Sequence, residues 1–168
     1  MATPPIVNIE EVTLAEQFRG PKGFPEAMPE KAMGIMTARL GPLLGAERLG
    51  CSLAVVPPGK TMFPYHLHHA NEEMFVVLSG HGTLRHDGEE YPIRQGDVIA
   101  APTGSSHQIQ NTSDAELRYL SISTMIWPEV CEYPDSGKIA AIPGPGGGGV
   151  HISRRDDIKP YWSGETLD

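Results

Sequence analysis

The run YHLHHANEE, residues 65–73, brings three histidines close to two carboxylates. Residues two apart on an extended strand face the same side, so His66 and His68 can direct both imidazoles at one point. Such a pair is suited to chelating a transition metal ion. Glu73 lies at an odd offset from His68 and returns to that side only if a turn intervenes at residues 70–71. The spacing therefore predicts a hairpin that carries three metal ligands.

A further ligand must come from a distant strand, and His107, just after the turn Pro102-Thr103-Gly104, is the best-placed candidate. Glu72 is an alternative to Glu73, but it would reverse the face on which Phe75 lies, so Glu73 is favoured. Three imidazoles and a carboxylate are costly to bury unless a divalent cation satisfies them. The predicted metal ligands are His66, His68, Glu73 and His107.

Three neutral nitrogens and one anionic oxygen form a donor set suited to one divalent transition metal ion. Fe(II), Mn(II), Ni(II), Co(II) and Zn(II) all fit this set, whereas Ca(II) prefers oxygen ligands alone. Four protein ligands on an octahedral ion leave about two positions for water or a chelating substrate. This is typical of a catalytic site rather than a closed structural one, although the sequence assigns no general acid or base.

Short β-strands are expected to position these residues. Glycine and proline account for 19 and 16 of the 168 residues, which disfavours long helices. From residue 32 onward, segments of β-type residues alternate with turn signals at roughly 8- to 12-residue spacing, as in sandwiches and barrels. An all-β fold is therefore predicted. The expected strands are 51–56, 73–78, 83–86, 90–94, 97–101, 107–110 and 117–123.

The alternation along these strands also predicts what surrounds the ligands. Four apolar side chains share the ligand face, as core or as pocket wall: Met62, Phe75, Val77 and Ile109. A late strand alternates Tyr119, Ser121 and Ser123 with aliphatic residues, and we expect this polar set to lie outside the main core. A cationic contact to a phosphate would have to come from a few basic residues near the motif strands, none of which strand parity forces inward: Lys60, Arg85, Arg94 and Arg118, with Arg39 and Arg48 earlier in the chain as alternatives.

The chain reads as one domain with flanking segments: an arm (1–31), a barrel (32–126) and a C-terminal tail (127–168). The arm can cover its own sheet or cross to a second subunit, so a homodimer is expected. The glycine-rich run 144–149 lacks the Lys and Ser or Thr of a phosphate-binding loop and reads as a flexible loop.

Charge and composition exclude several classes of partner. The formal net charge is −8, which disfavours nucleic acid and anionic membranes, so a small-molecule substrate is expected. Neither a signal-peptide pattern nor an apolar stretch of about 20 residues is found. Cys51 and Cys131 lie outside any CxxC pattern and read as reduced thiols. A cytoplasmic location is expected.

Two stretches of the chain resemble the paired motifs of the cupin superfamily. The first runs Gly59, six residues, His66-Leu67-His68, four residues, Glu73, six residues, Gly80. Its first spacer is one residue longer than the usual five. The second, which shows no deviation, runs Gly96, Pro102-Thr103-Gly104, His107, Asn111. The resemblance covers about 53–123 and implies a single jelly roll, or double-stranded β-helix barrel, with one metal at its mouth.

The resemblance implies several functions. A metal-dependent enzyme acting on a small oxygen-bearing molecule is favoured, either a sugar or sugar-phosphate isomerase or epimerase, or a dioxygenase. The apolar ligand face favours a compact substrate and dioxygenase chemistry over a polyanion. A non-catalytic small-molecule binding or sensor protein is the alternative, followed by a structural cupin. Segments 76–80 and 133–138 look like a group of small bacterial cupins mostly without assigned activity.

Overall fold

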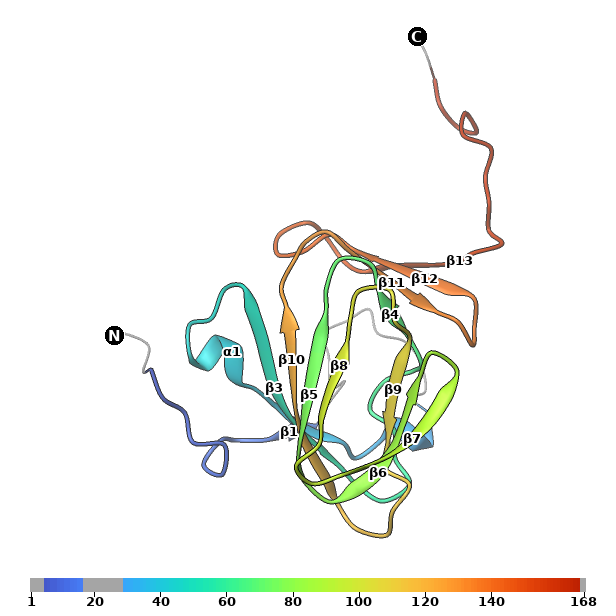
Figure 1. Cartoon of the computed structure of the whole chain (residues 1–168). Coiled ribbons are helices and arrows are strands. Elements are labelled where there is room, and N and C mark those ends of the chain that lie inside the picture. Colours follow the sequence, from blue (N-terminus) through green and yellow to red (C-terminus); the bar gives the residue numbers. More distant parts are fainter. Residues whose placement is uncertain (1–4, 17–28, 167–168) are drawn as a thin grey trace.

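The computed structural model describes residues 5–16 and 29–166, and two antiparallel sheets face each other across its interior (Figure 1). The larger sheet has the strand order β1-β2-β3-β10-β5-β8, and the smaller has the order β7-β6-β9. The larger sheet comprises β1 (Ala15–Glu16), β2 (Met36–Arg39), β3 (Leu49–Val56), β5 (Glu73–Ser79), β8 (Val98–Ala101) and β10 (Leu117–Thr124). The smaller comprises β6 (His81–His86), β7 (Glu89–Arg94) and β9 (His107–Gln110). The predicted all-β jelly-roll barrel is confirmed.

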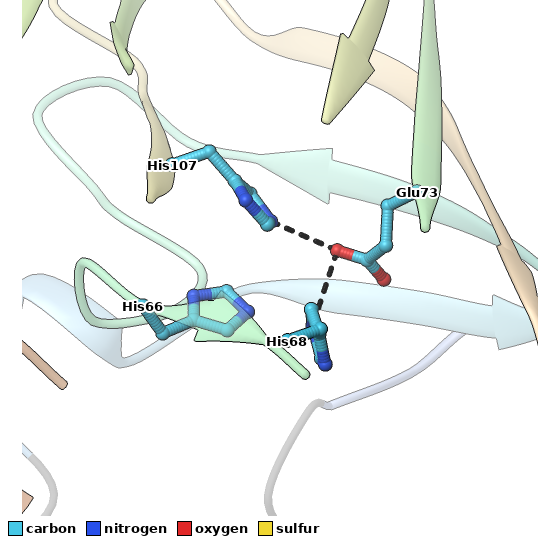
Figure 2. A group of neighbouring side chains, drawn as sticks. All are labelled: His66, His68, Glu73 and His107. Carbon is cyan, nitrogen blue, oxygen red and sulfur yellow. Dashed lines mark hydrogen bonds and ion pairs between the residues drawn. The ribbon is translucent and has the colours of Figure 1, made fainter. Parts of the chain in front are cut away.

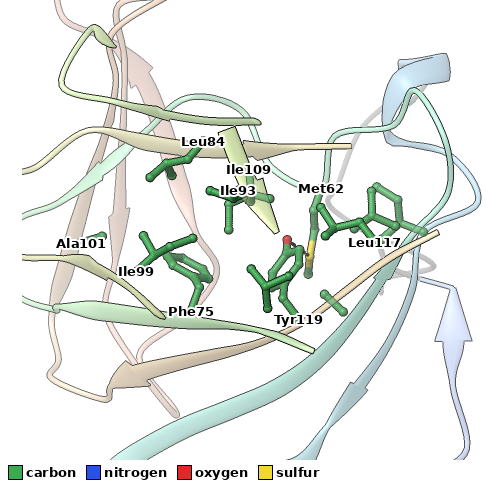
Figure 3. Close-up of a cluster of buried hydrophobic side chains, with 13 residues drawn as sticks. Met62, Phe75, Leu84, Ile93, Ile99, Ala101, Ile109, Leu117 and Tyr119 are labelled. Carbon is green, nitrogen blue, oxygen red and sulfur yellow. Dashed lines mark hydrogen bonds between the residues drawn. The ribbon is translucent and has the colours of Figure 1, made fainter. Parts of the chain in front are cut away.

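The main apolar core lies between these two sheets (Figure 3). On β5 the side chains alternate, so that Phe75 and Val77 are buried while Met74 is 45% exposed. Leu84 of β6 and Ile109 of β9 meet them from the opposite sheet. The four apolar residues that alternation placed on the ligand face all belong to this core: Met62, Phe75, Val77 and Ile109.

Strand β10 departs from the sequence-based expectation, which placed its polar set outside the main core. Tyr119 is only 2% exposed and its ring packs edge-on against Phe75, with centroids 6.0 Å apart. The Tyr119 hydroxyl donates to Met62 Sδ at 3.3 Å. Leu120 instead packs on the outer face of the sheet. The expectation was wrong for Tyr119, because a tyrosine ring buries well in an apolar core once its hydroxyl finds an acceptor. Ser121 and Ser123 are not part of the core cluster.

The outer face of the larger sheet carries a second apolar cluster, which includes Leu53 and Val55. Side chains from the N-terminal segment pack against it: Val7, Ile9, Val12 and Leu14. Residues 5–16 therefore cover their own sheet, while 1–4 and 17–28 of the expected arm lie outside the described residues. The helices within the described residues are η1 (Glu30–Ala32) and α1 (Leu40–Leu43). In the part of the chain described, no helix has the length and apolarity to cross a membrane.

The C-terminal segment forms a third sheet, of order β13-β12-β11-β4, at one end of the barrel (Figure 1). Its strands are β4 (Leu67–His68), β11 (Glu129–Tyr133), β12 (Lys138–Ile142) and β13 (His151–Arg154). No strand was predicted after residue 126, because prolines and glycines interrupt the β-type pattern of these short segments. The domain boundaries at 31 and 126 stay predictions, but β11 pairs directly with the histidine-bearing strand β4.

Candidate metal centre

An antiparallel bridge between His66 and His107 brings two distant segments together. The His66 N–H donates to the His107 carbonyl oxygen at 3.2 Å, and the His107 N–H donates to the His66 carbonyl oxygen at 2.8 Å. The two imidazole centroids are consequently 4.6 Å apart. The Gly104 N–H donates to the His68 carbonyl at 2.8 Å, and Gly104 adopts φ +87°, which favours glycine.

The structure brings together the four side chains that the spacing predicted (Figure 2). Their potential ligand atoms all lie within 4.8 Å of one another: His66, His68, Glu73 and His107. Glu73 Oε2 lies 2.9 Å from His107 Nε2 and 3.5 Å from His68 Nε2. Glu72 is exposed, and its N–H donates to Thr124 Oγ1 at 3.1 Å. Glu73, the favoured alternative, is therefore the carboxylate that faces the histidines.

Two of the imidazoles have their orientation fixed by backbone carbonyls. The Nδ1 of His66 lies 2.8 Å from the Pro64 oxygen, and the Nδ1 of His107 lies 3.2 Å from the Ser105 oxygen. Carbonyl oxygens only accept, so each Nδ1 carries a proton, and Nε2 is the nitrogen of each ring that remains available to a metal ion. Among the described residues, the buried His68 Nε2 has no hydrogen-bond partner. This orphaned nitrogen and the surrounding donor set fit a divalent transition metal ion.

The cluster is electrostatically coupled. Burial opposes the charge of Glu73, but the hydrogen bond from His107 and the nearby His68 imidazole outweigh it and lower the Glu73 pKa to about 2. Burial and the neighbouring histidines lower the pKa of His66 to about 4. Burial also opposes the charge of His68, but the contacts with Cys131 and with the Glu73 carboxylate outweigh it and raise its pKa to about 10. A metal ion bound to these four groups would therefore displace a proton from His68.

A cavity of about 210 Å³ opens on this cluster. Most of its wall is apolar: Phe63, Pro64, Phe75, Ile109, Tyr119 and Ile142. Polar side chains other than the four above also contribute: Gln108, Ser121, Cys131 and Tyr133. The Gln108 side-chain amide is committed, because it donates to the Phe63 carbonyl at 2.9 Å. The cavity therefore suits a compact ligand that meets the cluster at one end and apolar surface around it.

None of the described lysines and arginines lines the cavity. Arg85 forms a two-pronged pair with Asp135, with N–O distances of 2.6 and 2.9 Å. Arg118 contacts Glu10 at 3.2 Å. Lys60 donates to the Glu30 carbonyl at 2.8 Å. The basic residues near the motif strands therefore do not contribute to the cavity wall, and Lys60, Arg85 and Arg118 contact other groups.

Sequence reasoning missed the contribution of β11. Glu129, Cys131 and Tyr133 alternate along this strand, and the latter two line the cavity. Cys131 Sγ lies 3.3 Å from His68 Nδ1. The Tyr133 ring stacks at 24° against His66, with centroids 6.1 Å apart. The alternation of these three residues is visible in the sequence. No local pattern, however, indicates that their side of the strand faces the histidines.

Comparison with known proteins identifies the family. Residues 52–123 match the family model of the cupin domain. A proposed sugar phosphate isomerase from Acidithiobacillus ferrooxidans is 32% identical, with a TM-score of 0.71, over 77% of this chain and 81% of that one. A sugar phosphate isomerase of the cupin superfamily from Silicibacter pomeroyi is 24% identical, with a TM-score of 0.78, over 91% and 94% of the two chains. The chain belongs to the cupin superfamily.

A curated relative extends this similarity. The oxalate-binding protein of Thermotoga maritima is 32% identical over 71 residues, which are 42% of this chain and 58% of that protein. The chain spans little more than half the length of the first curated relatives it matches, 58% and 55%. The similarity thus covers part of each protein rather than the whole of either.

Proposed function

We propose that the chain binds one divalent transition metal ion through His66, His68, Glu73 and His107 and acts as a metal-dependent enzyme on a small oxygen-bearing molecule. The observation that carries the proposal is the buried group of three imidazoles and one carboxylate at a cavity of about 210 Å³. Fe, Mn, Ni, Co and Zn suit this donor set. When bound, such an ion would polarise a substrate oxygen or, if redox-active, support dioxygenase chemistry.

The side chains around the cluster would do the remaining work. The apolar wall, which includes Phe75 and Ile109, excludes water from the ligand. Ser121 and Tyr133 bring hydroxyl groups to the same space and can orient the oxygens of a substrate. Burial raises the pKa of Tyr133, so at neutral pH its hydroxyl is a hydrogen-bond donor rather than an anion.

Two types of metal-dependent reaction are compatible with this site. The similarity at 32% identity to a proposed sugar phosphate isomerase supports isomerase or epimerase chemistry on a sugar or sugar phosphate. The apolar wall supports dioxygenase chemistry on a compact substrate. Since no described lysine or arginine lines the cavity, an unphosphorylated substrate fits it better than a phosphorylated one.

A non-catalytic small-molecule binding protein is the second candidate. The 32% identity to an oxalate-binding protein across 71 residues supports it. So does the cavity wall, because among the described residues it contains Glu73 as its only carboxylate and no lysine. A sensor requires a shaped cavity beside the ion but no separate proton-transfer group.

Metal analysis of the purified protein, combined with turnover assays, separates these functions. Dioxygen uptake would be measured with candidate substrates on the iron-loaded protein, and isomerisation of free and phosphorylated sugars on the manganese- and zinc-loaded protein. Substrate-dependent uptake removes the isomerase, and isomerisation without uptake removes the dioxygenase. Tight ligand binding without turnover supports the binding protein. A chain that takes up none of the five metals contradicts the whole proposal.

We also propose a cytoplasmic homodimer that handles a small molecule and binds neither nucleic acid nor membranes. The net charge of −8 argues against binding to nucleic acid and anionic membranes, and the two free cysteines suit a reducing compartment. Apolar side chains left exposed near the C-terminus support the dimer. Tyr161 is 84% and Trp162 64% exposed. Light scattering coupled to gel filtration should give twice the mass of the chain, whereas the 18.2 kDa of one chain would contradict the dimer.

A further inference from the structure

His68 differs from the other two histidines of the cluster in what faces its Nδ1. His66 and His107 each direct Nδ1 at the carbonyl two residues earlier in the chain. The Nδ1 of His68 instead lies 3.3 Å from Cys131 Sγ and 3.4 Å from Glu129 Oε2. Both partners come from β11, more than 60 residues away in sequence. The third imidazole therefore takes its outer contacts from the C-terminal sheet.

Strand pairing explains this arrangement. In the antiparallel pair of β4 and β11, Cys131 stands directly opposite His68. Directly opposed residues project to the same side of a sheet, so the thiol and the imidazole meet. Glu129 precedes Cys131 by two positions and shares its face. Cys131 is 3% exposed, so water does not compete for the contact.

Glu129 also holds the turn that separates His68 from Glu73. Its Oε1 accepts from the backbone N–H groups of His69 and Ala70, both at 3.1 Å. Its Oε2 accepts from the N–H of Asn71 at 3.0 Å and from the side-chain amide of the same residue. Glu129 is only 2% exposed. One buried carboxylate thus fixes three consecutive backbone groups of the turn that returns Glu73 to the histidine side.

A carboxylate beside an imidazole nitrogen selects the tautomer, because an ionised carboxylate only accepts hydrogen bonds. With Glu129 facing Nδ1 of His68, Nδ1 keeps its proton when a metal ion binds, and the ion takes Nε2, the nitrogen on the Glu73 side. Glu129 itself is a poor metal ligand, since both of its oxygens already accept several hydrogen bonds. Its proximity to His68 and Cys131 therefore indicates support of one metal site rather than a second site.

We propose that Glu129 and Cys131 are positioning residues of the metal site, which hold the turn at 69–71 and the Nδ1–H of His68 so that His68 and Glu73 reach the same ion. The inference rests on the proposed function, because it requires that the cluster bind a metal. Outer contacts of this kind typically change metal affinity by roughly 10- to 100-fold. Residues outside the two cupin motifs would then influence how tightly the motif residues bind the metal ion.

The test titrates metal-free protein with Zn²⁺ and compares variants with matched controls. Glu129→Gln keeps the shape of the side chain but replaces one carboxylate oxygen with an amide nitrogen, which cannot accept hydrogen bonds from the N–H groups of the turn. Glu132→Gln is its control on the same strand. Cys131→Ala removes the sulfur, Cys131→Ser restores a hydrogen-bond acceptor, and Cys51→Ala is the control. Nitrogen-15 NMR of the zinc-loaded proteins reports which His68 nitrogen carries the proton, a property that general loss of stability would not change.

We expect Glu129→Gln and Cys131→Ala to weaken zinc binding by roughly 10- to 100-fold, with a mixed His68 tautomer. Both controls should match the wild type, and Cys131→Ser should recover most of the affinity. Wild-type affinity and tautomer in both Glu129→Gln and Cys131→Ala would overturn the inference while leaving the metal site intact.

Two further results have distinct meanings. If Cys131→Ser binds zinc no better than Cys131→Ala, the sulfur is a metal ligand and the inference is wrong. If the wild-type protein binds no zinc or other divalent metal, the proposed function itself fails. Should Glu129→Gln not fold, the Cys131 series decides alone.

Discussion

The two sides of the metal cluster are built in different ways. On the barrel side, His66 and His107 face each other across a backbone bridge, and each imidazole is oriented by a carbonyl two residues away. On the C-terminal side, His68 depends on Glu129 and Cys131 of β11. The barrel side therefore carries its own support within short motifs, whereas the other side borrows support from a separate sheet.

This difference separates ligands from the residues that hold them. Removing a barrel ligand should affect metal binding directly. Removing a support from β11 should affect folding stability and, through geometry, metal binding as well. Substitutions on each side can therefore distinguish the two roles.

The largest effect is expected for His107→Ala. This change removes a metal ligand on the barrel side. The affinity for metal should therefore fall by more than roughly 100-fold, the upper range for the loss of a residue that only contacts a ligand. Metal content by inductively coupled plasma mass spectrometry and zinc titration measure it, with the exposed His151 replaced by alanine as a control. Unchanged metal content would remove His107 from the ligand set.

Glu129→Ala should produce the largest loss of stability on the C-terminal side. It leaves the N–H groups of His69, Ala70 and Asn71 without their acceptor. Each unsatisfied group costs about 1 to 3 kcal/mol, so we expect a loss of about 3 kcal/mol or more. Urea unfolding of the metal-free protein at pH 7 measures it.

Glu132→Ala is the matched control for this stability change. Glu132 pairs at the surface with His69 and with the exposed Arg155. Its loss should cost no more than about 1 kcal/mol. Equal losses for the two alanine variants would contradict the distinction between a buried support and a surface pair.

The Glu129 carboxylate should also make the folding stability depend on pH. Burial opposes the charge of Glu129, but hydrogen bonds from Asn71 and Ala70 outweigh it and lower its pKa below the usual 4.5. Its stabilising contribution is therefore complete above about pH 4.5 and is lost as the pH falls through the lowered pKa. Wild-type protein should lose stability faster than Glu129→Gln on acidification below pH 4.5. Parallel melting curves for the two proteins between pH 5 and pH 3 would argue against this contribution.

The smallest effect is expected at the Arg85–Asp135 pair, which links the barrel to the turn after β11. Arg85 is partly exposed and also lies over the Tyr65 ring, 3.7 Å from its centroid. Since such exposed pairs contribute little, Arg85→Ala should cost about 1 kcal/mol and leave zinc affinity unchanged. A tenfold loss of affinity would show that the C-terminal side supports the metal through more than β11.

The contrast also marks how far sequence reasoning reaches. Strand alternation and motif spacing were sufficient for seven of the nine strands described in the two facing sheets, β1 and β2 being missed. They were also sufficient for the meeting of the histidines with Glu73, because these features depend on local periodicity and turns. The required turn at 70–71 followed from the odd offset between His68 and Glu73. What holds that turn did not follow, because Glu129 reaches it from 58 residues away.

Two other features were not predicted from the sequence, for related reasons. Tyr119 was expected outside the core because its neighbours on the strand are aliphatic, but the sheet buries aliphatic side chains on both of its faces. Strands β11 to β13 were hidden by the prolines and glycines between them. In each case the deciding contact is tertiary, and period-two patterns do not specify which sheet faces which.

The central claim is that four side chains bind a single divalent ion, and a crystal structure of the cobalt-loaded protein tests it most directly. Anomalous scattering at the cobalt edge should show one peak per chain, within roughly 2.0 to 2.2 Å of His66, His68, Glu73 and His107. A peak elsewhere, or no peak in protein soaked with cobalt, would contradict the account.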